Sequence, residues 1–243
     1  FCKNKTFLQI STAEVLSKVI AFRNLQEGMT VDIPYVDDQG IVHIIEYKID
    51  KIFDLWLGMP AFGLVDHKGI GAPILLYRGT DMSLHKKRGW ASLFSDLDIQ
   101  GPGLKAFLNA RNEISSWLKR HSLSGKKTRV FGYSLGGVLC TYTILYEHEN
   151  LDVAQSMAFS PPGVSSDTYT MWMKLNPNIR ESYRIFVSHG DIIPKVGKMV
   201  GKAYEHSLEF HLRPLDAHVR LMCCQPNVYQ FLIDIDRENK EGR

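Results

Sequence analysis

Hydrophobic and polar positions near the start of the chain follow a helical period. In "STAEVLSKVIAFRNLQEG" (residues 11–28), apolar residues recur three and four positions apart, which predicts an amphipathic helix. Ser11 is its expected N-cap, Glu14 completes a capping box, and Gly28 ends the helix. The predicted apolar face consists of Val15, Leu16, Val19, Ile20 and Phe22.

The pattern then changes to that of strands. "VDIPYVDDQGIVHIIEYKI" (31–49) predicts a β-hairpin that turns at residues 37–40, and Pro34 places its first strand at a sheet edge. The glycine-rich and aromatic segment 53–73 predicts irregular structure with a short strand. "APILLYRGT" (72–80) predicts a buried strand, since a short apolar run between turn residues is typical of the centre of a sheet.

Helices and strands alternate through the rest of the chain. The pattern predicts helices at 104–125 and 135–149, a helix or loop at 165–180, and strands at 128–132, 152–160, 183–188 and 205–215. Such alternation predicts an α/β fold with a mainly parallel central sheet flanked by helices. We expect one domain over 1–243, in which 1–70 decorate a core at 71–235.

The candidate chemistry centres on "TRVFGYSLGGVLC", where Ser134 lies between a predicted strand and a predicted helix. Gly132 and Gly136 complete a GxSxG pattern in the strand–turn–helix context that favours a nucleophilic serine. The alternative interpretation is that Ser134 is only a small residue at a tight turn, without a catalytic role. A nucleophilic serine would lie at a helix N-terminus, where backbone N–H groups point at the space above its oxygen.

A serine hydroxyl needs a base, and the base needs an orienting acid. The candidate acid is Asp191, at the end of a predicted strand, with Asp216 a weaker alternative that we expect in a turn. The downstream histidines are His206, His211 and His218, and we favour His218 because it lies in a predicted loop, with His206 second. His189 lies too near Asp191 in sequence for both to meet over the serine.

An acyl-transfer site also needs donors for the oxyanion. The N–H of Leu135, next after the nucleophile, is one candidate. Thr80 ends the predicted strand 72–80 and offers a second N–H, together with its hydroxyl. Taken alone, the segment 78–80 would be a plain turn.

Together these motifs resemble the class 3 lipases, the fungal-type branch of the α/β-hydrolases. "LYRGT" is similar to the family's oxyanion strand, "GYSLGGVLC" to its Gly-His-Ser-Leu-Gly-Gly elbow, "FSPPGV" to the segment after the next strand, and "GDIIPKV" to its acid loop. The resemblance covers roughly residues 70–225. It implies a serine esterase or lipase that cleaves lipid or other acyl esters through a Ser134–His218–Asp191 triad, without a metal or organic cofactor.

The sequence departs from the family pattern in three places. Tyr133 replaces the usual histidine before the serine, a side chain that belongs to the support of the elbow. "QGPG" (100–103) lacks the family's His-x-Gly-Phe form, and the stretch from Asp191 to His218 is shorter than in many relatives. If residues 81–100 form the lid that the family often carries, Trp90, Leu93 and Phe94 are candidates for lipid contact, as well as for ordinary core positions.

Composition narrows the classes of partner. The chain has 243 residues and a formal net charge of +3, and its basic clusters at 85–88 and 125–129 lack interleaved aromatics, which argues against nucleic-acid binding. Contact with an anionic membrane surface stays open. No apolar run reaches the roughly 20 residues of a membrane span, and the first residues lack the pattern of a signal peptide. Because the sequence begins at Phe1, the question of an upstream targeting segment stays open.

The cysteine pattern does not predict a metal site or a disulfide framework. The four cysteines show no ligand spacing typical of zinc, and the adjacent pair Cys223 and Cys224 is ill-suited to bridge to itself. This usage favours a reducing compartment, against which the Asn4 sequon is weak contrary evidence, so the localisation stays unknown.

Two rival functions follow from the same motifs. One is an inactive binding or scaffolding module that keeps the hydrolase fold, which the departures from the family pattern suggest. The other keeps the triad but changes the acyl chemistry to that of a thioesterase, an acyltransferase or a peptidase.

Overall fold

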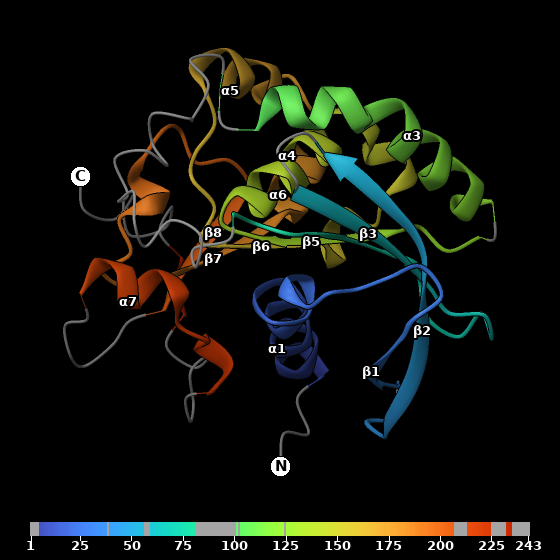
Figure 1. Cartoon of the computed structure of the whole chain (residues 1–243). Helices are drawn as coiled ribbons and strands as arrows, with labels where there is room; N and C mark the ends of the chain where they lie inside the picture. Colours follow the sequence, from blue (N-terminus) through green and yellow to red (C-terminus); the bar gives the residue numbers. More distant parts are fainter. Residues whose placement is uncertain are drawn as a thin grey trace.

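The computed structural model describes residues 5–37, 39–55, 59–80, 101, 103–123, 125–206, 213–224 and 232–234. In these ranges nine strands form one sheet in chain order (Figure 1). The strands are β1 (Thr30–Val36), β2 (Val42–Leu55), β3 (Met59–Val65), β4 (Ile74–Tyr77), β5 (Arg129–Tyr133), β6 (Met157–Phe159), β7 (Arg184–Ser188), β8 (Lys202–His206) and β9 (Leu232–Asp234).

The centre of the sheet is parallel. Strands β4 to β8 pair in parallel, whereas β1 to β4 form an antiparallel wing and β9 is antiparallel to β8. With helices on both faces, this arrangement confirms the predicted α/β fold. The carboxyl ends of the parallel strands therefore meet at one edge, where functional groups gather in open α/β sheets.

Helices cover the two faces unequally. One face carries α3 (Leu104–Ser122), α4 (Leu135–Glu147), α5 (Ser166–Met173) and α6 (Pro177–Ser182), and the other carries α1 (Lys5–Lys18), with α7 (Pro214–Val219) near the edge (Figure 1). Short 3-10 helices lie at Ile20–Phe22 (η1), His148–Asn150 (η2), Val153–Gln155 (η3), Ile193–Lys195 (η4) and Met222–Cys224 (η5).

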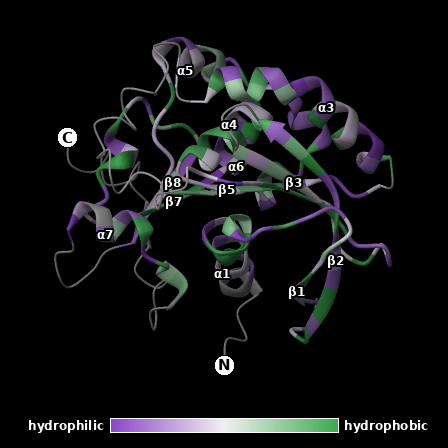
Figure 2. Cartoon of the chain, viewed as in Figure 1, coloured by the Kyte–Doolittle hydropathy of each residue, from purple (hydrophilic) through white to green (hydrophobic). Residues whose placement is uncertain are grey.

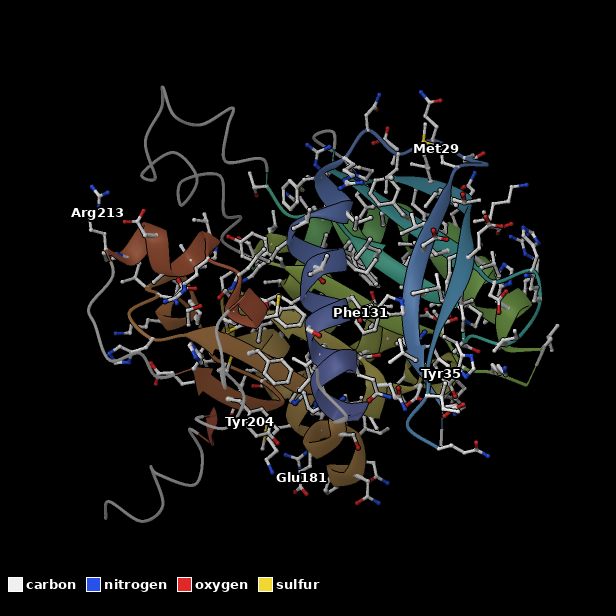
Figure 3. All side chains as sticks on the ribbon, turned by 90° about the horizontal axis from the view of Figure 1, so that it is seen from below. Met29, Tyr35, Phe131, Glu181, Tyr204 and Arg213 are labelled. Atoms are coloured by element: carbon white, nitrogen blue, oxygen red, sulfur yellow. The ribbon has the colours of Figure 1, made fainter. Side chains whose placement is uncertain are left out.

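Each face of the sheet has its own hydrophobic core. Along α3, hydrophobic and hydrophilic residues alternate (Figure 2), and the buried ones include Phe107, Ile114 and Trp117. Ile10 and Leu16 of α1 belong to the second core on the opposite face, where Phe131 of β5 lies beside the helix (Figure 3). Of the helices in the described ranges, none combines the length and apolar character that crossing a bilayer requires.

The predicted N-terminal helix has the wrong bounds. It begins at Lys5 and ends at Lys18, so Ser11 lies inside it rather than at its N-cap. Its buried face carries Ala13, Glu14 and Ser17, whereas Val15 is only half-buried. The predicted start is wrong because Glu14, taken as the acid of a capping box, lies on the buried face and instead accepts the Met222 and Cys223 N–H groups.

The predicted hairpin is confirmed, but the segment after it is more regular than expected. β1 and β2 pair through a turn at 37–40, and β1, with Pro34, forms the sheet edge. The short strand predicted within 53–73 is present as β3, at residues 59–65. Gly63 makes room there for the Trp117 ring, because a Cβ on it would lie 2.6 Å from that ring.

The last predicted strand, 205–215, has the wrong bounds. β8 spans Lys202–His206, residues 207–212 lie outside the described ranges, and residues 214–215 belong to α7, which also carries His218, expected in a loop. Pro214 lies in the first turn of α7, where proline favours the start of a helix. The strand prediction did not take this signal into account.

Candidate active site

Ser134 occupies a strained turn between β5 and α4. Its φ of 54° and ψ of −126° are rare for a residue with a side chain, and such conformations cost on the order of 1–3 kcal/mol. The Ser134 N–H donates to the carbonyl of Phe159 at 2.9 Å, and the Ser134 carbonyl accepts from Gly137 N–H at 2.9 Å. The surrounding main chain thus fixes a conformation that the serine alone would not choose.

The glycines on either side of Ser134 allow this turn to form. A Cβ on Gly132 would lie 2.3 Å from the carbonyl oxygen of Gly136. A Cβ on Gly136 would lie 2.8 Å from the carbonyl oxygen of Tyr77 at the end of β4. Any side chain here would push the helix away from the strands, which explains the GxSxG spacing in physical terms.

Three predicted residues from distant parts of the chain meet at this turn. His218 Nε2 lies 3.0 Å from Ser134 Oγ, and His218 Nδ1 lies 2.8 Å from Asp191 Oδ2. Relative exposures are 5% for Ser134, 0% for His218 and 4% for Asp191. In this arrangement a base contacts a hydroxyl on one side and a carboxylate on the other, as nucleophilic catalysis by serine requires.

Asp191 is held at the carboxyl end of β7. Its N–H donates to the Ser188 carbonyl at 3.1 Å, and its Oδ1 accepts the Ile193 N–H at 3.0 Å, which leaves Oδ2 for His218. Gly190, with φ of 82°, makes the turn that brings the carboxylate back over the sheet edge.

The other candidate acid and bases have different surroundings. His206 ends β8, buried, and within the described part of the chain its Nδ1 has no hydrogen-bond partner. Burial is the main cause that lowers the pKa of His206, followed by the nearby Arg220. His189 Nδ1 lies 2.9 Å from Glu205, and Asp216 accepts from Arg213 Nε at 2.9 Å. His211 lies outside the described residues.

Comparison with known proteins identifies the family of the chain. Residues 78–200 match the family model described as Lipase (class 3). The chain belongs to the class 3 lipase family. This membership supports hydrolysis of lipid esters and identifies the chain as a lipase-like hydrolase.

Solved structures of fungal lipases share the fold of this class 3 lipase. A triacylglycerol lipase from Penicillium expansum has 13% identity and a TM-score of 0.55, with 84% of this chain and 81% of that chain covered. The Lip2 lipase from Yarrowia lipolytica has 14% identity and a TM-score of 0.53, with coverages of 87% and 82%. A search of curated proteins gives no match.

Tyr133 has a contact beside Ser134 that the sequence did not reveal. Its hydroxyl donates to the backbone carbonyl of His218 at 3.0 Å, and the two rings lie 4.9 Å apart. Burial, with smaller contributions from Asp191 and Glu14, raises the pKa of the phenol, so it stays a donor at neutral pH. No local pattern signals this contact, because 85 residues separate the two partners.

The predicted oxyanion donors flank the same turn. Leu135 is the first residue of α4, where N–H groups lack acceptors within the helix. The segment that leads to Thr80 lies against the elbow, since a Cβ on Gly79 would be 2.5 Å from the Tyr133 carbonyl oxygen and 3.5 Å from Ser134 Cβ.

The predicted lid at 81–100, with Trp90, Leu93 and Phe94, lies outside the described residues. Among the described residues, no group of three or more His, Cys, Asp or Glu side chains could hold a metal ion.

Proposed function

We propose that this class 3 lipase hydrolyses acyl esters of lipids through Ser134, His218 and Asp191. The observation that carries the proposal is the pair of short contacts on His218, 3.0 Å to Ser134 Oγ and 2.8 Å to Asp191 Oδ2. The strained backbone of Ser134 supports the same role, because strain of this kind is kept where a nucleophile must be presented.

The chemistry is acyl transfer in two steps. Ser134 Oγ attacks the ester carbonyl while His218 Nε2 takes its proton, and His218 then gives this proton to the leaving alcohol as the ester C–O bond breaks. In the second step His218 removes a proton from water, which attacks the acyl-enzyme, and the acid leaves as Ser134 recovers its proton. Asp191 keeps the imidazole in the tautomer with the proton on Nδ1.

The developing oxyanion needs preorganised donors. We assign this role to the N–H groups of Leu135 and Thr80, together with the Thr80 hydroxyl. One such donor is worth roughly 10²–10³-fold in kcat in serine hydrolases. The reaction as written needs no metal or organic cofactor.

Turnover of p-nitrophenyl esters with short and long acyl chains tests the proposal. We expect Ser134→Ala and His218→Ala each to lower kcat by at least about 10³-fold, and Asp191→Asn by a similar factor, because the three residues act as a unit. His206→Gln is the matched control for the histidine and keeps wild-type turnover. The proposal is wrong if Ser134→Ala turns over these esters as fast as the wild type, and the assigned base is wrong if only His206→Gln is inactive.

Matched thioester and amide substrates in the same assay identify the acyl chemistry. We expect the ester to be the fastest substrate. A preference for the thioester or the amide would instead indicate a thioesterase or a peptidase.

A further inference from the structure

A buried ion pair on α1 lies on the opposite face of the sheet from α4. Glu14 Oε1 and Lys18 Nζ are 2.9 Å apart, with side-chain exposures of 0% and 2%. Burying two charges costs several kcal/mol per ion unless further hydrogen bonds compensate for the lost water. The contacts that this pair makes therefore indicate why it is retained.

Both charges bind the main chain of the segment that follows His218. Glu14 accepts the Met222 N–H on Oε1 and the Cys223 N–H on Oε2, each at 2.8 Å. Lys18 Nζ donates to the Arg220 carbonyl at 2.5 Å. More than 200 residues separate each pair of partners, so these are tertiary contacts between α1 and the last part of the described chain.

The held segment begins two residues after His218. Met222 is fully buried in the same hydrophobic core as Leu16 of α1. Lys18 Nζ also lies 5.2 Å from the centre of the Tyr133 ring, whose hydroxyl binds the His218 carbonyl. Apolar contact is non-directional, whereas hydrogen bonds to three main-chain groups within residues 220–223 fix the position of this segment along α1.

We propose that Glu14 and Lys18 are positioning residues for His218, holding the backbone of residues 220–223 so that the imidazole stays in line between Ser134 and Asp191. This inference rests on the proposed function, since it assigns His218 a catalytic role. Neither residue touches the reacting atoms; both act through the main chain of the segment that carries the base. An N-terminal helix far from the elbow in sequence thereby becomes part of the site's support.

The test uses a double variant that removes both charges together. Glu14→Gln/Lys18→Met nearly keeps the side-chain volumes and removes both charges of the pair together, so that neither stays buried without the other. Glu14→Gln alone is the harsher variant, because it leaves the buried Lys18 ammonium without its partner charge and turns an amide nitrogen toward one of the two N–H donors. Ser17→Ala and Leu16→Ala are controls on α1. Ser17 Oγ donates to the Ala13 carbonyl of its own helix at 2.7 Å, and Leu16 is a buried core residue.

We expect the double variant to lower kcat for ester hydrolysis by roughly 10- to 100-fold with KM nearly unchanged, since a misplacement of about 1 Å can cost 10²-fold. The pH profile of kcat/KM should shift, because its limb reports the base. The low-field proton NMR signal of the His218 Nδ1–H that binds Asp191 should broaden or disappear. Neither control variant should alter the pH profile or this signal.

The outcomes separate the two proposals. A double variant with wild-type kcat, pH profile and low-field signal would overturn the positioning role while the triad stands. If the wild type hydrolyses no ester, the proposed function fails, and the NMR signal still decides whether α1 holds His218. Equal changes in the double variant and in Leu16→Ala would show that α1 contributes only general stability, and would also overturn the positioning role.

Discussion

Tyr133 occupies the position immediately before Ser134, yet its hydroxyl binds the segment that carries His218. The bond to the His218 carbonyl is buried, with Tyr133 only 4% exposed. A histidine at this position, as the family usually has, would not place a phenol oxygen at the same point. A single side chain thus links the turn of the proposed nucleophile to the backbone of the proposed base.

We predict that Tyr133→Phe destabilises the protein and lowers its turnover. The ring remains, but the His218 carbonyl loses its donor, and an unsatisfied buried polar group costs about 1–3 kcal/mol. Urea unfolding measures the free energy, and kcat for a p-nitrophenyl ester should fall several-fold at 25 °C.

Tyr47→Phe provides the control, because the Tyr47 hydroxyl also donates to a backbone carbonyl, that of Ala72, at 3.0 Å in a part-buried position away from Ser134. It should reduce stability by less than Tyr133→Phe does, since Arg129 still donates to the Ala72 carbonyl, and leave kcat unchanged. Equal kcat values for Tyr133→Phe and the wild type would contradict the proposed link to His218.

At the scale of elements, the site depends on how closely α4 approaches the ends of β4 and β5. Gly136 lies close to the end of β4, and the atoms nearest to a Cβ on it are main-chain atoms that cannot rotate away. Overpacking a rigid site forces backbone shifts that cost typically 1–3 kcal/mol. The helix start, with Leu135 and its N–H, would move with such a shift.

Gly136→Ala should therefore lose both stability and activity. Gly63→Ala makes a similar clash with the Trp117 ring on a different part of the sheet, 2.6 Å from the added Cβ, and should lose stability only. Comparing kcat per folded molecule in the two variants separates the effects. Full activity in folded Gly136→Ala would contradict the assigned role of this contact.

Elements that depend on local signals were predictable from the sequence. β5, α4 and the turn between them follow from the glycine spacing and the change of period at Ser134. α1 was misplaced because Glu14 lies on its buried face, where its partners are Met222 and Cys223. A short strand was predicted within 53–73, but the bounds of β3 were not, because the space that Gly63 leaves is filled by Trp117 of α3, a helix that comes much later in the chain.

At the scale of the whole molecule, the parallel sheet brings together site residues from three separate segments of the chain. Ser134 follows β5 and Asp191 follows β7. His218 lies on α7, which comes after β8 in the sequence. The order of motifs was enough to nominate these three residues, because the elbow, the acid and the histidine occur in the sequence order typical of this fold. The supports were not predictable, since α1 lies about 200 residues away from the segment that it holds.

The central claim is that Ser134 is the nucleophile and His218 its base. The most direct measurement is covalent labelling with a fluorophosphonate, followed by mass spectrometry of the digested protein to locate the adduct. We predict one adduct on Ser134 in the wild type, none in Ser134→Ala, and labelling slowed by at least about 10³-fold in His218→Ala. Absence of an adduct in the wild type, or equal labelling of Ser134→Ala, would contradict the claim.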